Sequence, residues 1–139
     1  YVLGVTTVIF GKHIDKYSID KARKIYTLPV LIGEKAARYA VLSMLILPYL
    51  ITAYLIAIKF FTPVMAIVLL AIPTLRSLYP AFLKPKPEAR PADFPDGQGG
   101  WPLYFAPISF MNNRKFGSLF VIGLLVDVLL RIFVPMFWR

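Results

Sequence analysis

One polar segment of this 139-residue chain carries most of the side chains that could do chemistry. It covers residues 11–33 and combines two carboxylates, Asp15 and Asp20, with four nearby cations: Lys16, Lys21, Arg23 and Lys24. Carboxylate oxygens are the ligands that Mg²⁺ prefers, and lysine and arginine side chains neutralise phosphate oxygens. The pattern therefore fits a site for a metal-bound diphosphate. It also fits a solvated loop carrying the positive charge expected beside a membrane span.

The sequence on both sides of this segment is strongly apolar, which sets the class of fold. The chain is 58% hydrophobic and 17% charged, whereas an ordinary soluble domain is about 45–50% apolar. Full spans are predicted at 39–58, 64–83 and 116–138, and a partial span at about 1–11, because crossing a bilayer takes roughly 20 apolar residues. The apolar runs show no period-2 alternation, so helices are predicted rather than a barrel. We expect a single all-α integral membrane domain, a polytopic bundle of about three and a half helices.

Several classes of site are excluded by composition. The chain has no cysteine, which rules out disulfides and thiolate metal sites, and its one histidine, His13, is too few for a histidine-rich zinc or haem site. The net charge of +9 could suggest a nucleic-acid partner. The cations lie in the loops between spans, as membrane topology requires, so no nucleic-acid partner is expected.

The distribution of cations also predicts sidedness. Seven lie before the first full span and five lie in the segment 84–115, whereas the other side holds only Lys59 and Arg139. Because positive charge gathers on the cytoplasmic side of a membrane, loops 12–38 and 84–115 are predicted to be cytoplasmic. The C-terminus is then predicted to lie on the opposite side.

Two charges fall inside the last predicted span. Asp127 and Arg131 are four residues apart, which places them on one face of a helix. Charges at this depth are costly and usually face the bundle or each other. We interpret them as a structural intramembrane ion pair; the alternative is that they tune a pocket.

The polar segment resembles the second aspartate-rich segment of UbiA-type intramembrane prenyltransferases. Asp20, Lys21 and Ala22 match the family's last D-R/K-A element, and residues 27–33, TLPVLIG, match the run that follows it. The later NRKFG, residues 113–117, is also similar to the sequence leading into the family's last span. The resemblance covers most of this chain but only the C-terminal half of a family member. We therefore expect the chain, which begins at Tyr1 within an apolar run, to be the C-terminal half of a longer one.

The resemblance implies transfer of a polyprenyl group from a polyprenyl diphosphate to a lipid-phase acceptor, such as a quinone precursor or a tetrapyrrole. It implies Mg²⁺ as cofactor, with Asp20 as the first metal ligand and Asp15 as the second. It also implies that four cations grip the diphosphate: Lys16, Lys21, Arg23 and Lys24. The expected partners are membrane lipid and the polyprenyl diphosphate.

Two features depart from the family pattern. Family members space these aspartates four residues apart, whereas Asp15 and Asp20 are five apart, about 140° around an ideal helix. Lys16 occupies the position of the four-spaced aspartate. The family's first aspartate-rich motif is also missing from these residues. The alternative function is therefore a non-catalytic helical subunit packed among other subunits of a larger membrane complex.

Overall fold

The computed structural model describes residues 2–92 and 101–133, and every regular element in those ranges is a helix. The elements are α1 (Val2–Asp15), α2 (Tyr17–Ala22), α3 (Leu28–Ile32), α4 (Glu34–Ala57), η1 (Pro63–Ala71), α5 (Ile72–Leu83) and α6 (Phe105–Phe133). Three helical stretches are long and apolar enough to cross a membrane: Glu34–Ala57, Pro63–Leu83 and Phe105–Phe133. The predicted all-α membrane class is confirmed.

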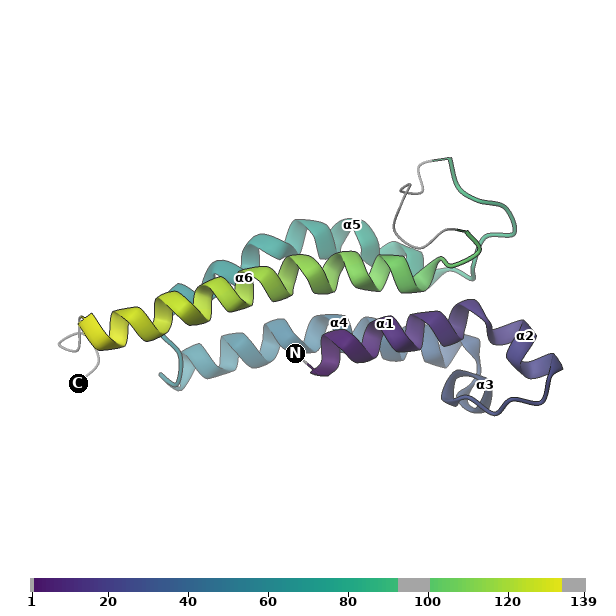
Figure 1. Ribbon diagram of the computed structural model, residues 1–139, viewed down its shortest axis with the longest axis horizontal. Helices are drawn as coiled ribbons and strands as arrows, with labels where there is room; N and C mark the ends of the chain where they lie inside the picture. Colours follow the sequence, from purple (N-terminus) through teal and green to yellow (C-terminus); the bar gives the residue numbers. More distant parts are fainter. Residues whose placement is uncertain (1, 93–100, 134–139) are drawn as a thin grey trace.

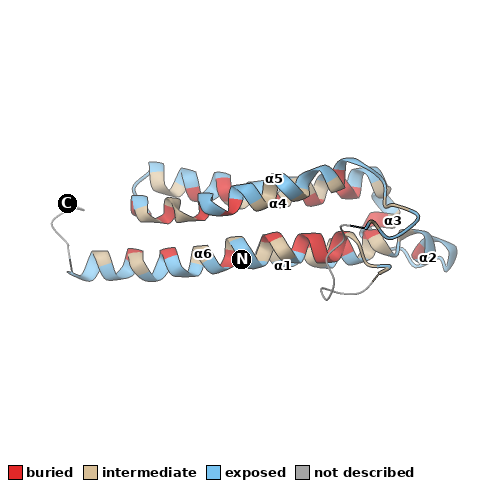
Figure 2. Cartoon of the chain, turned by 90° about the horizontal axis from the view of Figure 1, so that it is seen from above, coloured by how far each residue is buried: buried red, intermediate tan, exposed pale blue. Residues whose placement is uncertain are grey.

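The long helices lie side by side along the long axis of the molecule. In Figure 1, α4 and α1 form one layer, and α5 and α6 form the other. Seen from above in Figure 2, α4 and α5 fall in one row and α1 and α6 in a second row. Helix α1 accompanies only about half of the bundle, the half nearer α2 and α3. We call this end of the bundle, which carries α2, α3 and residues 84–92, the loop-bearing end.

Two small clusters of buried side chains hold the helices together. The cluster nearer the loop-bearing end joins α1, α4, α5 and α6 through Ile14, Ala37, Val41, Leu45, Phe82, Phe105 and Ile108. The second joins α4 to η1 through Tyr49, Val68 and Ala71. At most 22% of the apolar window of any span is buried, and Figure 2 shows the exposed residues on the outer faces. Hydrocarbon or further helices must cover those faces, because exposing so much apolar surface to water is unfavourable.

Small residues allow α1 to approach α6 closely. Gly4, Thr7 and Gly11 share one face of α1, and a Cβ added at Gly11 would lie 2.8 Å from backbone atoms of Phe105 and Ala106. Such close backbone contact through small residues is typical of helices that pack in membranes, where apolar side chains gain little by leaving lipid.

The second span is not a continuous α-helix. Its first half, η1, is a 3₁₀ helix, and α5 follows it directly. Pro73 has no N–H group, so it cannot donate to the carbonyl oxygen of Leu69, four residues earlier. The N–H of Ile72 bonds to that oxygen instead, which is the i→i−3 pattern of a 3₁₀ helix. The combined bounds, Pro63–Leu83, agree with the predicted span 64–83.

The last helix begins well before the start predicted for its membrane span. Helix α6 starts at Phe105, eleven residues before the expected start at 116, so residues 105–115, which were predicted to be loop, are helical. The prediction was wrong because Asn112, Arg114 and Lys115 lower the local hydropathy without interrupting the helix. The predicted end at 138 lies outside the described residues.

The polar segment is also largely helical, although it was predicted to be a loop. Helix α1 continues to Asp15 rather than ending near residue 11, and α2 and α3 follow it. The TLPVLIG run forms α3 and the junction with α4: Pro29 lies in the first turn, where a missing N–H costs nothing. Gly33 has φ +89°, a conformation that side-chain-bearing residues rarely adopt, which explains glycine at this junction.

Candidate functional site

The predicted site residues gather at the loop-bearing end. This end joins the C-terminal ends of α1 and α5 to the N-terminal ends of α4 and α6, and it carries α2 and α3 (Figure 1). The chain reverses here twice, so residues 12–38 and 84–92 lie at the same end although they are far apart in sequence. The cations of these two segments therefore lie at one end of the bundle.

Asp15 is engaged by the backbone of α6. Its Oδ1 accepts a hydrogen bond from the N–H of Phe105 at 2.9 Å, and its Oδ2 accepts one from the N–H of Ala106 at 3.0 Å. The first N–H groups of a helix have no partner within the helix, and its N-terminal end attracts negative charge. Lys86 Nζ lies 3.4 Å from the backbone oxygen of Asp15 and brings the segment after α5 to the same point. Asp15 therefore acts as a cap supplied to α6 from a distant helix.

The environment of Asp15 shifts its titration. Burial raises the pKa of this carboxyl group above its ordinary value. The hydrogen bonds from Phe105, Ala106 and Tyr104 and the charge of Lys86 oppose the rise without cancelling it. The folded chain therefore takes up a proton at this position at a higher pH than the unfolded chain.

A substitution at Asp15 should lower stability in a pH-dependent way. Asp15→Asn keeps only one acceptor oxygen for the two N–H groups of α6, so we expect a loss of about 1–2 kcal/mol. Because the folded pKa is raised, the titration of Asp15 adds most to stability below its unfolded pKa, and this part is lost as pH rises through the folded pKa. The advantage of wild type over Asp15→Asn, measured as a difference in thermal midpoint, should widen from about pH 7 to about pH 4. A difference that narrows would contradict the assigned environment.

The carboxylate of Asp20, unlike that of Asp15, is not occupied by hydrogen bonds from the backbone of the described residues. It is buried, at 8% exposure, and its Oδ2 lies 3.6 Å from His13 Nδ1, beyond hydrogen-bonding distance. His13 Nδ1 is itself buried and has no hydrogen-bond partner within residues 2–92 and 101–133. Neither oxygen of Asp20 accepts a backbone hydrogen bond in that part of the chain. Of the two predicted metal ligands, Asp20 is therefore the one whose carboxylate oxygens are still available to a ligand.

Four cations surround this carboxylate in sequence and are exposed: Lys16, Lys21, Arg23 and Lys24. Lys16 and Arg23 are the residues that flank α2, and Lys24 has φ +56°, which turns the chain out of that helix. Lys21 Nζ lies 5.7 Å from the centre of the Tyr17 ring. In the described ranges none of the four pairs with a carboxylate, so their charges remain available to an anion.

The residues at this end fit a shared magnesium site better than a site made by protein alone. Among the described residues no three carboxylate or histidine side chains come together. Mg²⁺ is commonly held by one or two carboxylates together with substrate phosphates and water. Asp20 suits such a role, whereas both oxygens of Asp15 already accept hydrogen bonds from α6.

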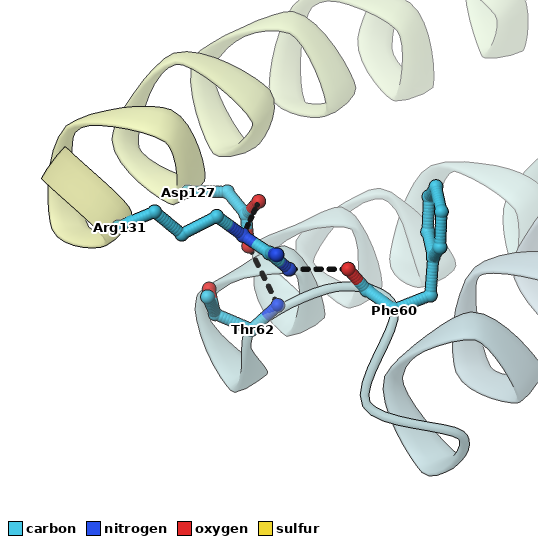
Figure 3. A network of polar contacts seen from close by, with 4 residues as sticks. All are labelled: Phe60, Thr62, Asp127 and Arg131. Atoms are coloured by element: carbon cyan, nitrogen blue, oxygen red, sulfur yellow. Dashed lines mark hydrogen bonds and ion pairs between the residues drawn. The ribbon is translucent and has the colours of Figure 1, made fainter. Parts of the chain in front are cut away.

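The charges at the opposite end serve the fold. Arg131 Nε lies 2.9 Å from Asp127 Oδ2, so the ion pair expected from their spacing is formed. Figure 3 shows both side chains reaching from α6 to the turn between α4 and η1. There Asp127 Oδ1 accepts a hydrogen bond of 2.6 Å from the N–H of Thr62, and Arg131 donates to the carbonyl oxygen of Phe60. The pair fixes the turn and caps η1, which favours the structural interpretation.

The sequence analysis missed the role of Arg38, which it counted only as a loop cation. Arg38 is 6% exposed and donates from Nη1 to the carbonyl oxygen of Phe82 at 3.1 Å, in the last turn of α5. A cation is favoured at that end of a helix, where carbonyl groups lack partners. The signal was present: Arg38 precedes Val41 and Leu45 at helical spacing and so shares their buried face.

A polar contact inside the bundle was also missed. The Tyr49 hydroxyl donates to Asn112 Oδ1 at 3.4 Å, linking the middle of α4 to α6. Beside it is a cavity of about 20 Å³ whose lining includes Gly4, Pro48, Asn112 and Asn113. This volume suits a single water molecule, which needs polar partners of this kind.

Known proteins give no direct guide to function. No family model, characterised protein or solved structure matches the chain. The prenyltransferase resemblance therefore rests on the residues that carry it. The structure adds their positions: residues 20–33 lie at the loop-bearing end, whereas residues 113–117 lie within α6.

Proposed function

We propose that this chain is the C-terminal half of an intramembrane prenyltransferase and that its loop-bearing end binds the diphosphate of a polyprenyl diphosphate. The observation that carries the proposal is the burial and hydrogen bonding of the Asp20 carboxylate. It is a buried carboxylate with no backbone hydrogen bond in the described ranges, and exposed cations occupy the adjoining turns. The charged head of such a substrate could bind at the loop-bearing end, and its apolar tail could lie along the adjoining apolar spans.

The proposed chemistry is departure of the diphosphate from the prenyl carbon. A bound Mg²⁺ would offset the charge that builds on the departing oxygens. In this chain Asp20 would hold the metal, and Lys16, Lys21, Arg23 and Lys24 would neutralise the remaining phosphate oxygens. His13 Nδ1 lies 3.6 Å from Asp20 Oδ2 and would be near the bound group. Asp15 contributes indirectly, because it anchors α6 against the end of α1.

We also propose that the loop-bearing end faces the cytoplasm. It holds the loop cations, including Lys12, Lys35 and Lys84, whereas the turn at the opposite end holds only Lys59 within the described ranges. Positive charge is retained on the cytoplasmic side during membrane insertion. Mg²⁺ would reach the site from that side, and the charged head of the substrate would lie there.

The second candidate is a non-catalytic helical subunit of a larger membrane complex. The observation that favours it is that Asp15, Arg38, Asp127 and Arg131 all bind the backbone at helix ends. Their charges are therefore explained without a substrate. Intact mass in the native membrane separates the two candidates, since the enzyme requires a chain about twice the 15.8 kDa of these residues.

Asp20→Asn tests the proposed function. The native protein, in its own membrane, is titrated with geranylgeranyl diphosphate in the presence of Mg²⁺, and binding is measured as a rise in thermal midpoint. We expect the variant to bind at least about tenfold more weakly, because a neutral amide is a poor ligand for Mg²⁺. Glu88→Gln, an exposed carboxylate at the same end, is the matched control and should bind like wild type. Equal, Mg²⁺-dependent binding by wild type and Asp20→Asn would overturn the site assignment.

A further inference from the structure

Helix α6 carries two cations, Arg114 and Lys115, that point away from the core. Both are exposed. They lie nine and ten residues after the first residue of α6, about 14 Å along the helix axis from its start. They lie directly before residues 116–133, the strongly apolar part of this helix. Cations that flank an apolar span are expected near the level of the lipid headgroups.

These two cations differ from the other charges on α6 in their contacts with the described part of the chain. Within residues 2–92 and 101–133, neither side chain forms an ion pair or a hydrogen bond. Arg131, on the same helix, pairs with Asp127 and with the backbone. Long basic side chains can extend toward the headgroup level, but their charge still requires an anion or water there. Both charges are therefore available to an anion from outside the chain.

The surface around Arg114 is grooved. One groove of about 460 Å³ lies between α5 and α6, and its lining includes Thr74, Met111, Arg114, Lys115 and Ser118. A second groove of about 440 Å³ runs along the neighbouring face of α6 and shares Arg114, Ser118 and Ile122 with the first. Arg114 and Ser118 thus form a ridge with a groove on each side.

We propose that Arg114 and Lys115 bind the phosphate of an anionic phospholipid whose acyl chain lies in the α5–α6 groove. Guanidinium and ammonium groups are strong partners of phosphate oxygens. The hydroxyl groups of Thr74 and Ser118 line the same groove and can donate to the headgroup. Basic pockets between membrane helices on the cytoplasmic side are typical sites for anionic headgroups.

The apolar part of the groove favours a lipid over a free phosphate ion. Met111, Leu119 and Ile122 line it together with the two cations, and the groove opens outward from the bundle. An acyl chain gains contact with these apolar side chains, whereas inorganic phosphate could use only the polar groups of the groove. The proposal does not depend on prenyl transfer, because it concerns a different helix face from Asp20 and is tested without activity.

The test compares two lipids with the same acyl chains. The purified protein in a neutral detergent is titrated with phosphatidylglycerol or with phosphatidylcholine, and bound lipid is counted by native mass spectrometry. We expect wild type to prefer phosphatidylglycerol. The double variant Arg114→Gln/Lys115→Gln should bind it about 25-fold more weakly, about fivefold for each charge, with phosphatidylcholine unchanged. Lys59→Gln, an exposed cation at the opposite end, should bind like wild type.

A second variant separates shape from charge. Ser118→Leu places a larger side chain on the ridge shared by both grooves and leaves both cations in place, so it should also reduce phosphatidylglycerol binding. Thermal midpoints without added lipid should stay close to that of wild type, because these side chains are exposed. Equal binding of the two lipids by wild type would overturn the proposal. So would full binding by the double variant, or competition by millimolar inorganic phosphate as effective as that by the lipid.

Discussion

Gly11→Ala is expected to detach α1 from α6. A Cβ at Gly11 would lie 2.8 Å from the carbonyl carbon and oxygen of Phe105 and from the nitrogen of Ala106. These are backbone atoms of a helix, which cannot rotate away as a side chain can. Relieving the clash means moving a whole helix, and we expect a loss of about 3 kcal/mol or more in unfolding free energy. Asp15 lies one turn further along α1, so the cap on α6 should be lost in the same step.

Gly4→Ala is the matched control for this prediction. A Cβ at Gly4 would meet the side-chain amide of Asn113, which can turn away. The same addition near the other end of the same helix should therefore cost much less. Thermal unfolding in detergent measures both variants. Similar losses of thermal stability for Gly4→Ala and Gly11→Ala would contradict the packing described here, because α1 would then respond to an added methyl group equally at both ends.

The membrane spans were the part of the fold that the sequence could predict. A bilayer requires about 20 apolar residues per helix, so the windows 39–58 and 64–83 lie close to α4 and to η1 with α5. Hydropathy reports burial in lipid and not where a helix begins. Helix α6 extends beyond its apolar part because Asp15, 90 residues away, caps its first turn. That contact joins distant parts of the chain, so local sequence could not reveal it.

The sequence groups the candidate site residues in one polar segment but cannot distinguish their environments. Spacing alone treats Asp15 and Asp20 as similar carboxylates in one polar segment. The structure separates them by their neighbours, since Asp15 bonds to the α6 backbone and Asp20 faces His13. The Asp127–Arg131 pair could be predicted because both residues share one helix. Its contacts with Thr62 and Phe60 depend on how α6 packs against a turn some 65–71 residues away.

The buried charges share one physical task. Asp15 and Asp127 accept hydrogen bonds from N–H groups at the starts of α6 and η1, and Arg38 donates to a carbonyl oxygen at the end of α5. Unpaired backbone groups are costly in a membrane, because no water is available to satisfy them. This bundle buries few apolar residues. Charged side chains that hydrogen-bond to the backbone at helix ends therefore contribute to its stability.

Asp127→Ala should be among the most damaging changes at the opposite end. It leaves the N–H of Thr62 without an acceptor in a buried position and removes the partner of Arg131, for a loss of about 3 kcal/mol. Asp127→Asn keeps an oxygen for Thr62 but no charge for Arg131. Because the Arg131 side chain is 41% exposed, this second loss should be only about 1 kcal/mol.

The pair of substitutions therefore separates the hydrogen bond from the ion pair. Arg131→Met supplies the third measurement, since it removes the charge but keeps the apolar stem and the Asp127–Thr62 hydrogen bond. We expect thermal midpoints in the order wild type, then Asp127→Asn and Arg131→Met close together, then Asp127→Ala. If Asp127→Asn were as unstable as Asp127→Ala, the charge and not the cap on η1 would be the main contribution. The turn between α4 and η1 would then depend on Arg131 and its bond to Phe60.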